Sequence, residues 1–340
     1  MDRVVTIGLD IAKSVFQGRG VDGEGAVVMR QRLTRARMLA FFTKQPSCLV
    51  GLEACGSAHY WARELSRLGH EVRLIPPSYV KPYVKRQKND AADAEAICEA
   101  VTRPSMRFVP IKSPEQQSTM VAHRTRSILT RQRTQLSNAI RGHMSEFGLV
   151  APVGRNGLEE LIAIIADASD GRVPKEARAC LLMLINQLRL VNAQILESDR
   201  LIIASARSTE VGRRLMEIPG VGPVLASALV AAVADPKSFS SGRNLAAWIG
   251  LVPRQNSSGW KERLGGITKQ GDRYLRNLLV IGALAVVRHA VRNGARRPWL
   301  VQLLARRTPK VAAVALANKN ARMVWAIMTS GERYREPIAA

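Results

Sequence analysis

Two carboxylates of this chain follow apolar runs that are typical of buried strands. Asp10 comes directly after residues 7–9, and Glu53 comes directly after residues 50–52. An ionised carboxylate beside a buried strand costs free energy unless a positive group pairs with it. If the two strands are parallel neighbours, both acids lie side by side at one edge of a sheet. The pattern therefore predicts a pair of acids able to bind a cation.

A second pair of acids, Asp90 and Asp93, lies at the start of a predicted helix over residues 91–101. Their spacing places both side chains on one helix face. Acids also stabilise helix N-termini, so helix capping is the alternative explanation for this pair. Together with Asp10 and Glu53, they could hold two divalent ions that stabilise both the attacking and the leaving oxygen of phosphodiester cleavage. Hard oxygen ligands favour Mg²⁺ or Mn²⁺ over zinc.

A candidate nucleophile lies in the polar loop that contains Ser257 and Ser258, just before Gly259. A serine in such a loop is usually only a turn former. No Ser-His-Asp spacing supports a hydrolase, and the five histidines do not cluster with these serines in the sequence. Serine chemistry therefore needs support from elsewhere in the chain.

The charge of the chain indicates its partner. Lys and Arg number 51 against 27 Asp and Glu, so the 340 residues carry a formal net charge of +24. This excess argues against an ordinary small-metabolite enzyme and favours a nucleic acid. Residues 237–322 alone hold 17 basic residues and two acids, which a solvated surface explains less well than nucleic-acid contact. Because aromatic residues make up only 5% of the chain, we expect phosphate contacts rather than base stacking.

The same composition predicts a cytoplasmic protein associated with the nucleoid. Four scattered cysteines without a C-x-x-C pair are typical of a reducing compartment. No signal peptide is expected, because a strand-like run begins almost at the first residue. The most apolar stretches, 221–234 and 278–287, are shorter than the about 18–20 residues that span a membrane, so no membrane partner is expected.

Residues 1–115 alternate strand and helix signals. Strands are predicted over 4–9, 15–21, 26–33, 48–52 and 71–75, and helices over 35–43, 58–68 and 91–101. This order predicts an α/β domain with a mixed sheet flanked by helices, as in ribonuclease-H-like nucleases.

Residues 116–208 are predicted to form long helices. Residues 116–145 contain no acid, and a second helix is expected from 175 to 205. Apolar residues of the second helix follow a seven-residue repeat that the polar Ser198 interrupts once. They are Leu181, Leu184, Leu188, Val191, Ile195 and Ile202. An antiparallel hairpin, a dimerising coiled coil and plain packing within one domain all remain open. The first helix provides four candidate nucleic-acid contacts, Arg124, Arg126, Arg131 and Arg133.

Residues 209–340 are expected to form a basic, mainly helical domain. The segment 218–226 resembles a helix-hairpin-helix element, in which Gly220 and Gly222 would expose amide N–H groups to a phosphate. Further candidate nucleic-acid contacts are the basic residues around the serine loop, Arg254, Lys261, Arg263, Lys269, Arg273 and Arg276.

These motifs resemble the DEDD-type insertion-sequence transposases of the IS110 family. The match keeps motif order over nearly the whole chain. The acidic motifs correspond to residues 8–10, 52–56 and 88–94, and the C-terminal motifs to residues 218–222, 251–254, 258–259 and 267–272.

The resemblance implies a RuvC-like N-terminal domain, joined through a coiled coil to a C-terminal transposase domain. It also implies that Ser258 forms a covalent phosphoserine link to DNA while metal-bound carboxylates activate the phosphate. Ser257 is the second choice for this role. An active site assembled from two protomers of a dimer or tetramer, and a structured guide RNA that selects donor and target DNA, are implied as well.

Three other functions compete with this interpretation. A RuvC-like junction-resolving or repair nuclease would use water instead of serine. A sugar-kinase or actin-like ATPase could use residues 7–13 to contact phosphate, but the chain lacks a glycine-rich adenosine motif. An architectural DNA-binding protein would leave the acids at the strand ends unexplained, since they would repel the phosphates that it binds.

Overall fold

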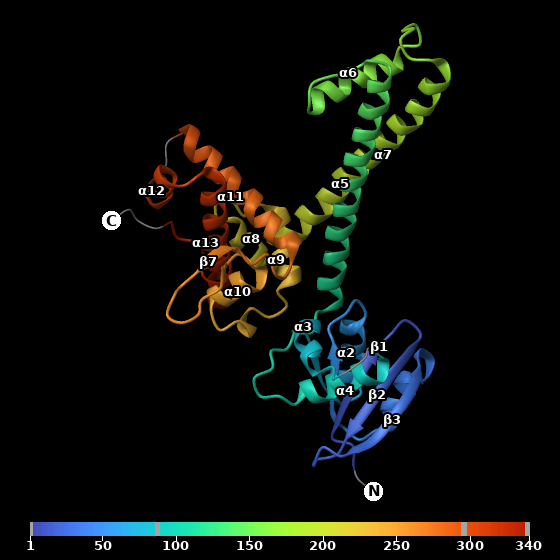
Figure 1. The fold of residues 1–340 in the computed structure, drawn as a ribbon, viewed down its shortest axis with the longest axis vertical. Coiled ribbons are helices and arrows are strands. Elements are labelled where there is room, and N and C mark those ends of the chain that lie inside the picture. Colours follow the sequence, from blue (N-terminus) through green and yellow to red (C-terminus); the bar gives the residue numbers. More distant parts are fainter. Residues whose placement is uncertain (1–2, 86–88, 294–297, 337–340) are drawn as a thin grey trace. The chain divides into compact units, whose positions relative to one another are not determined.

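The computed structural model describes residues 3–85, 89–293 and 298–336. The chain divides into two compact units, Met1–Pro114 and Glu115–Ala340 (Figure 1). The second unit contains both the long helices and the basic C-terminal region, which were expected as separate domains. Ala206, near the end of the second long helix, belongs to the same core as the C-terminal helices.

The first unit is built on one mixed sheet with the strand order β3-β2-β1-β4-β5. β1 pairs with β2 in antiparallel and with β4 in parallel orientation, and β5 lies parallel to β4. The strands are β1 Thr6–Ile11, β2 Val15–Val21, β3 Val27–Thr34, β4 Leu49–Glu53 and β5 Glu71–Ile75. The predicted mixed α/β sheet and its order of strands and helices are confirmed.

Two helices cover one face of this sheet. α1 (Met38–Lys44) and α2 (Ala58–Arg67) pack on a core that includes Ile7 and Leu9 of β1. The alternation of buried side chains along β1 therefore leaves Gly8 and Asp10 on the opposite face.

The opposite face carries α4 (Asp90–Val101), which follows the short helix α3 (Pro77–Val80) and the 3₁₀ turn Lys81–Tyr83. Two glycines let α4 approach the strands at van der Waals distance. A Cβ at Gly8 would overlap backbone atoms of α4, and a Cβ at Gly51 would lie 2.8 Å from Cβ of Val101. Small residues at these two positions therefore set the distance between α4 and the sheet.

Three helices form the first part of the second unit: α5 (Pro114–Glu146), α6 (Arg155–Ala166) and α7 (Lys175–Ser208). Ile140 and Met144 of α5 share a core with residues of α6 and α7. Arg178 of α7 is 9% exposed and donates hydrogen bonds to carbonyls at the end of α6, including Ile165 at 2.7 Å. This guanidinium satisfies carbonyl groups that the end of a helix leaves without partners.

The apolar seam of α7 differs from the predicted one at two positions. Ile185 is buried and Leu184 is only half-buried. Ser198, where a break was predicted, is also buried. Ile185 is the more buried of the two neighbours because it lies inside the core shared with α5 and α6, against which Leu184 packs from its edge.

The rest of the second unit is mainly helical, as expected. Its core joins α9, α10, α11 and α13, and it contains one short antiparallel hairpin, β6–β7. The elements are α8 Glu210–Met216, α9 Pro223–Ala232, α10 Gly242–Ile249, β6 Pro253–Gln255, β7 Leu264–Ile267, α11 Arg273–Asn293, α12 Pro298–Arg306 and α13 Pro309–Ser330.

Two helices among the described residues, Lys175–Ser208 and Arg273–Arg292, are long and apolar enough to cross a membrane by length and composition. The second of these helices extends the apolar stretch 278–287 at both ends. Core helices of globular proteins meet the same criterion, and both helices contribute side chains to the cores described above.

Because α4 leaves no room at Gly8, the substitution Gly8→Ala is expected to destabilise the first unit by about 1–3 kcal/mol or more. The added methyl group meets the backbone of α4 rather than a flexible side chain. Gly23→Ala is the matched control, because nothing lies within 4 Å of a Cβ there. Denaturant unfolding of the full chain measures both; equal stability of the two variants would contradict the proposed close approach.

Candidate active site

The two strand-end acids lie on neighbouring parallel strands. Leu9 of β1 pairs with Leu52 of β4, so Asp10 and Glu53 follow at the carboxyl ends of adjacent strands. Both are half-buried. Side chains alternate along each strand, so these acids share the face of Gly8 and Gly51, on which α4 packs.

The other two acids lie in the first turn of α4. Its N-cap is Asn89, whose side-chain oxygen accepts a hydrogen bond from the amide of Ala92 at 2.8 Å. Asp90 and Asp93 are therefore not the capping residues, although a helix N-terminus stabilises their charge. Sequence reasoning missed Asn89, even though Asn directly before a helical segment is a common capping signal.

Electrostatics link the four carboxylates. Burial raises the pKa of Asp10 to about 6, and repulsion from three other carboxylates adds to this shift. In order of strength, these are Asp93, Asp90 and Glu53. A hydrogen bond from the backbone of Ile11 lowers this pKa. Asp10 is therefore close enough to the other three acids to feel their negative charge.

Carboxylates that repel one another, presented as oxygen ligands, suit a divalent cation. However, no group of three or more acidic, His or Cys side chains in the described part of the chain is arranged to hold a metal ion. The four residues provide the charge for a cation site without the closed geometry of one.

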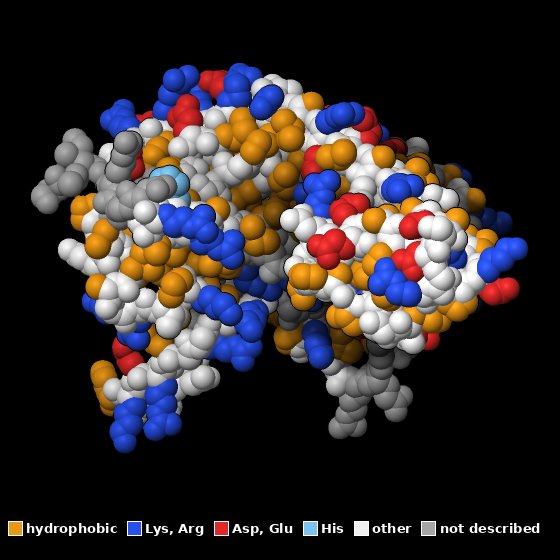
Figure 2. Space-filling model, turned by 90° about the horizontal axis from the view of Figure 1, so that it is seen from above, with side chains coloured by type: hydrophobic (Ala, Val, Ile, Leu, Met, Phe, Trp, Pro, Cys, Tyr) orange, Lys and Arg blue, Asp and Glu red, His pale blue; other side chains and the backbone are white. Residues whose placement is uncertain are grey.

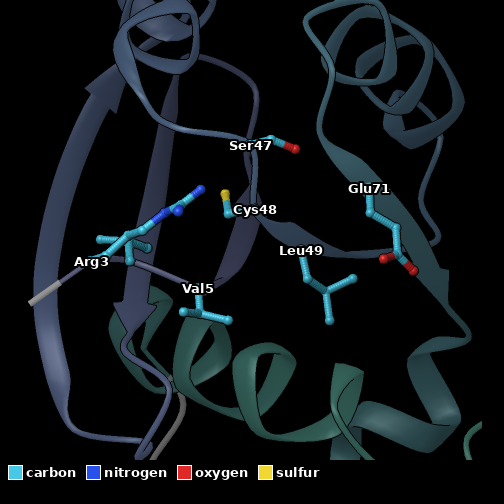
Figure 3. Close-up of a pocket in the computed structure, with 7 residues that line it drawn as sticks. Arg3, Val5, Ser47, Cys48, Leu49 and Glu71 are labelled. Atoms are coloured by element: carbon cyan, nitrogen blue, oxygen red, sulfur yellow. The ribbon is translucent and has the colours of Figure 1, made fainter.

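A cavity of about 380 Å³ lies at the opposite end of the parallel strands (Figure 3). Arg3 extends toward Cys48, and Glu71 lies on the neighbouring strand β5. Burial raises the pKa of the Cys48 thiol to about 11, so this thiol stays protonated and is a poor nucleophile. The cavity contains none of the four predicted acids.

The candidate nucleophile lies in the loop between β6 and β7. The backbone of Ser258 pairs with Lys261, while Ser257 Oγ accepts a hydrogen bond from the amide of Arg263 at 3.2 Å. Both serines are exposed. No hydrogen bond to Ser258 Oγ occurs among the described residues, so this hydroxyl is the more accessible of the two. Trp260, which sequence reasoning passed over, is fully exposed beside it, with a φ of 64° that is unusual for a bulky residue.

Most of the predicted nucleic-acid contacts are exposed, and Figure 2 shows Lys and Arg side chains spread over much of the visible surface. The exposed members are Arg124, Arg131, Arg133, Arg254, Lys261, Arg263, Lys269 and Arg273.

Two predicted contacts, Arg126 and Arg276, have intramolecular roles instead. Arg126 forms an ion pair with Asp199 of α7. Arg276 is 8% exposed and donates to the carbonyls of Ile249 and Gln270, both at 2.8 Å. These guanidinium groups are bound to protein oxygens, so we no longer assign them to nucleic acid.

The two glycines before α9 have different structural roles. Gly220 has a φ of 91°, which favours glycine, and its carbonyl lies so close to Gly282 of α11 that a Cβ on Gly282 would overlap it. Gly220 therefore serves packing between the turn and α11. Gly222 is exposed and is the N-cap of α9.

One Ser–His pair does occur, but it is buried. His123 Nε2 lies 3.1 Å from Ser227 Oγ, and His123 Nδ1 lies 3.0 Å from the hydroxyl of Tyr274. His123 is 1% exposed and Ser227 is 2% exposed, so this pair is out of reach of a substrate. Burial, followed by the nearby charge of Arg126, lowers the pKa of His123 to about 4.

Two family models match the chain. One is described as "Transposase IS116/IS110/IS902 family" and matches residues 212–298, and the other is a DEDD-type model described as "Transposase" that matches residues 7–148. A probable family 20 transposase of Pseudomonas aeruginosa is 51% identical over 97% of this chain and 98% of the relative. The transposase for insertion sequence element IS1111A of Coxiella burnetii is 42% identical over 98% of this chain and 92% of the relative.

The chain belongs to the IS110 family of insertion-sequence transposases. The resemblance inferred from the motifs is thereby confirmed, and this transposase is an enzyme that acts on DNA. The DEDD model covers the four acids predicted to form the site, and the other model covers the loop with Ser258.

The raised pKa of Asp10 predicts how this transposase responds to pH. Its value of about 6 exceeds the ordinary 3.8, so the folded state holds the proton more tightly than the unfolded state. The resulting stability is fully present below about pH 4 and is lost as the pH rises through about 6. In the presence of a metal chelator, the free energy of unfolding of Asp10→Asn is therefore expected to exceed that of the wild type by on the order of 2 kcal/mol at about pH 8. At about pH 4 the two values should be equal.

Denaturant titrations at both pH values measure this difference. Adding Mg²⁺ at about pH 8 should stabilise the wild type more than Asp10→Asn. A loss of stability in Asp10→Asn at both pH values would instead identify Asp10 as a structural acid.

Proposed function

We propose that this transposase cuts and exchanges DNA strands by means of the carboxylates Asp10, Glu53, Asp90 and Asp93 and the nucleophile Ser258. The observation that carries this proposal is the convergence of four acids on one face of the sheet, with the pKa of Asp10 raised to about 6. A protein with a net charge of +24 gains nothing for DNA binding from such a cluster, because it repels phosphate. A role in binding divalent cations explains its cost.

In this proposal the four carboxylates would hold two divalent ions, either Mg²⁺ or Mn²⁺. When bound, these ions would supply charge stabilisation to the scissile phosphate. Ser258 Oγ attacks the phosphorus, the bond from phosphorus to one DNA oxygen breaks, and the strand remains joined to the protein as a phosphoserine. A free serine hydroxyl is a weak nucleophile, and no acid or histidine contacts Ser258 among the described residues, so activation has to come from groups outside its loop.

The remaining features of the proposal rest on family resemblance. They are a RuvC-like character of the sheet domain, a coiled coil formed by α5 and α7, and a helix-hairpin-helix character of α8 and α9. We also include an active site shared between protomers of a dimer or tetramer, and a structured guide RNA that selects donor and target DNA. A cytoplasmic, nucleoid-associated location without a membrane partner completes it.

The second candidate is a RuvC-like nuclease that uses water as nucleophile. The same acids would serve it, so the serine decides between the two. The accessible hydroxyl of Ser258, in a loop flanked by Arg254, Lys261 and Arg263, favours the transposase mechanism.

Ser258→Ala is expected to abolish the covalent protein–DNA adduct, because the attacking oxygen is removed. Ser257→Ala is the matched control and should retain the adduct. A nicked suicide substrate that traps the adduct, resolved on a denaturing gel, measures both variants. Full strand exchange by Ser258→Ala would refute the nucleophile assignment, and adduct loss only in Ser257→Ala would transfer it to Ser257.

RNA purified with the wild-type protein from cells that carry the whole element is expected to contain one discrete transcript from the element's non-coding end. Sequencing of that RNA checks this expectation, with Ser258→Ala as a control that should retain the same RNA. Purification with random cellular RNA would contradict guidance by an element-encoded transcript.

A further inference from the structure

A row of side chains crosses the sheet from Asp10 to its outer edge. In the strand register, Asp10 of β1 faces Gln17 of β2, and Gln17 faces Arg32 of β3. Residues that face one another across paired strands point to the same side of a sheet. Arg32 therefore lies on the same face as Asp10, two strand spacings or roughly 10 Å away.

A parallel row runs through Gly8, Arg19 and Arg30. Arg19 forms an ion pair with Glu95 of α4, which shows that this is the face that α4 covers. α4 packs on β1, β2 and β4, and β3 is the edge strand (Figure 1). Arg30 and Arg32 are both exposed, so they project beside α4.

The charges of these two arginines are not balanced. Arg19 shares the carboxylate of Glu95 with Lys85, but within the described ranges no ion pair or hydrogen bond engages the side chain of Arg30 or Arg32. The nearest acids along the chain are Glu24, which is exposed, and Asp22. The carboxylate of Asp22 accepts hydrogen bonds from the amides of Glu24 and Ala26 in the turn between β2 and β3. Two free guanidinium groups therefore stand next to a cluster of acids.

This arrangement resolves a physical difficulty of the site. Without bound metal ions, four carboxylates repel a phosphate backbone, and fixed cations beside them would hold the strand to be cut whether or not ions are bound. Guanidinium groups bind phosphate oxygens with two parallel hydrogen bonds, which fixes position as well as charge.

We propose that Arg30 and Arg32 bind backbone phosphates of the DNA strand being cut, within a few nucleotides of the phosphate at Asp10. The half-buried Gln17 lies between Arg32 and Asp10 along one row, and Arg30 lies in the neighbouring row. This inference rests on the proposed function, because it takes Asp10 as the site of cleavage. It makes the open face of β3, beside α4, the path by which the strand reaches the carboxylates.

Protection of an edge strand is the competing explanation for these arginines. Charged side chains on an edge strand prevent pairing with other chains, and acids serve as well as bases for that purpose. Charge sign therefore separates the two explanations.

The decisive experiment measures DNA affinity against salt concentration for single and double variants, with DNA containing the element end. Each of Arg30→Gln and Arg32→Gln should weaken binding about tenfold and reduce the slope of log K against log salt by about one. The double variant should combine both effects and slow adduct formation. Arg30→Glu/Arg32→Glu should bind more weakly still.

Gln31→Glu is the matched control. Gln31 is exposed on the same strand and pairs with Gly18, on the opposite face from Arg32. The substitution Gln31→Glu lowers the net charge of the chain by one, as Arg32→Gln does. It therefore measures the effect of overall charge on DNA binding. We expect its salt slope to stay within about a third of a unit of the wild type.

Several results would overturn the inference. Equal weakening by Gln31→Glu and Arg32→Gln would reduce the effect to overall charge. Wild-type DNA binding by Arg30→Glu/Arg32→Glu would leave only edge protection. Loss of RNA binding with unchanged DNA binding would assign the arginines to RNA.

The affinity measurement does not require cleavage, so it decides the inference independently of the proposed function. Retained cleavage in Asp10→Asn would refute the proposed function, and wild-type affinity and salt slope in the double variant would refute the role of Arg30 and Arg32.

Discussion

The close approach of α4 to two glycines of the sheet underlies the arrangement of the site. Gly8 and Gly51 allow α4 to lie directly on β1 and β4, which brings the first turn of the helix to the strand ends that carry Asp10 and Glu53. Repulsion of Asp10 by the carboxylates of the helix favours a separation of helix and sheet. Burial of Ile97 and Val101 and the ion pair of Glu95 with Arg19 oppose it. Packing elsewhere on the same helix thus offsets the repulsion among the acids.

The sequence was informative where local pattern determines structure. Apolar runs followed by acids predicted the ends of β1 and β4, and the spacing of Asp90 and Asp93 predicted one helix face. The close approach at Gly8 was not predicted, because the partner of a glycine depends on tertiary packing. Burial of Leu184 was predicted from a seven-residue repeat, whereas tertiary packing against α5 and α6 buries Ile185 instead.

Charge was the least transferable signal. Arg126 and Arg276 have the same residue type as the exposed arginines around them, yet tertiary contacts assign them to Asp199 and to backbone carbonyls. Arg178 likewise satisfies the end of α6. A strongly basic chain therefore uses part of its arginine content to hold helices together. Only the structure separates these residues from the ones available to a polyanion.

The buried contacts of His123 affect how this enzyme senses acidity. With a pKa of about 4, the imidazole that joins α5 to α9 and α11 is neutral at weakly acidic and at neutral pH. The contacts of His123 with Ser227 and Tyr274 are therefore the same at both. The carboxyl group of Asp10 in the sheet domain, in contrast, changes its charge between these conditions.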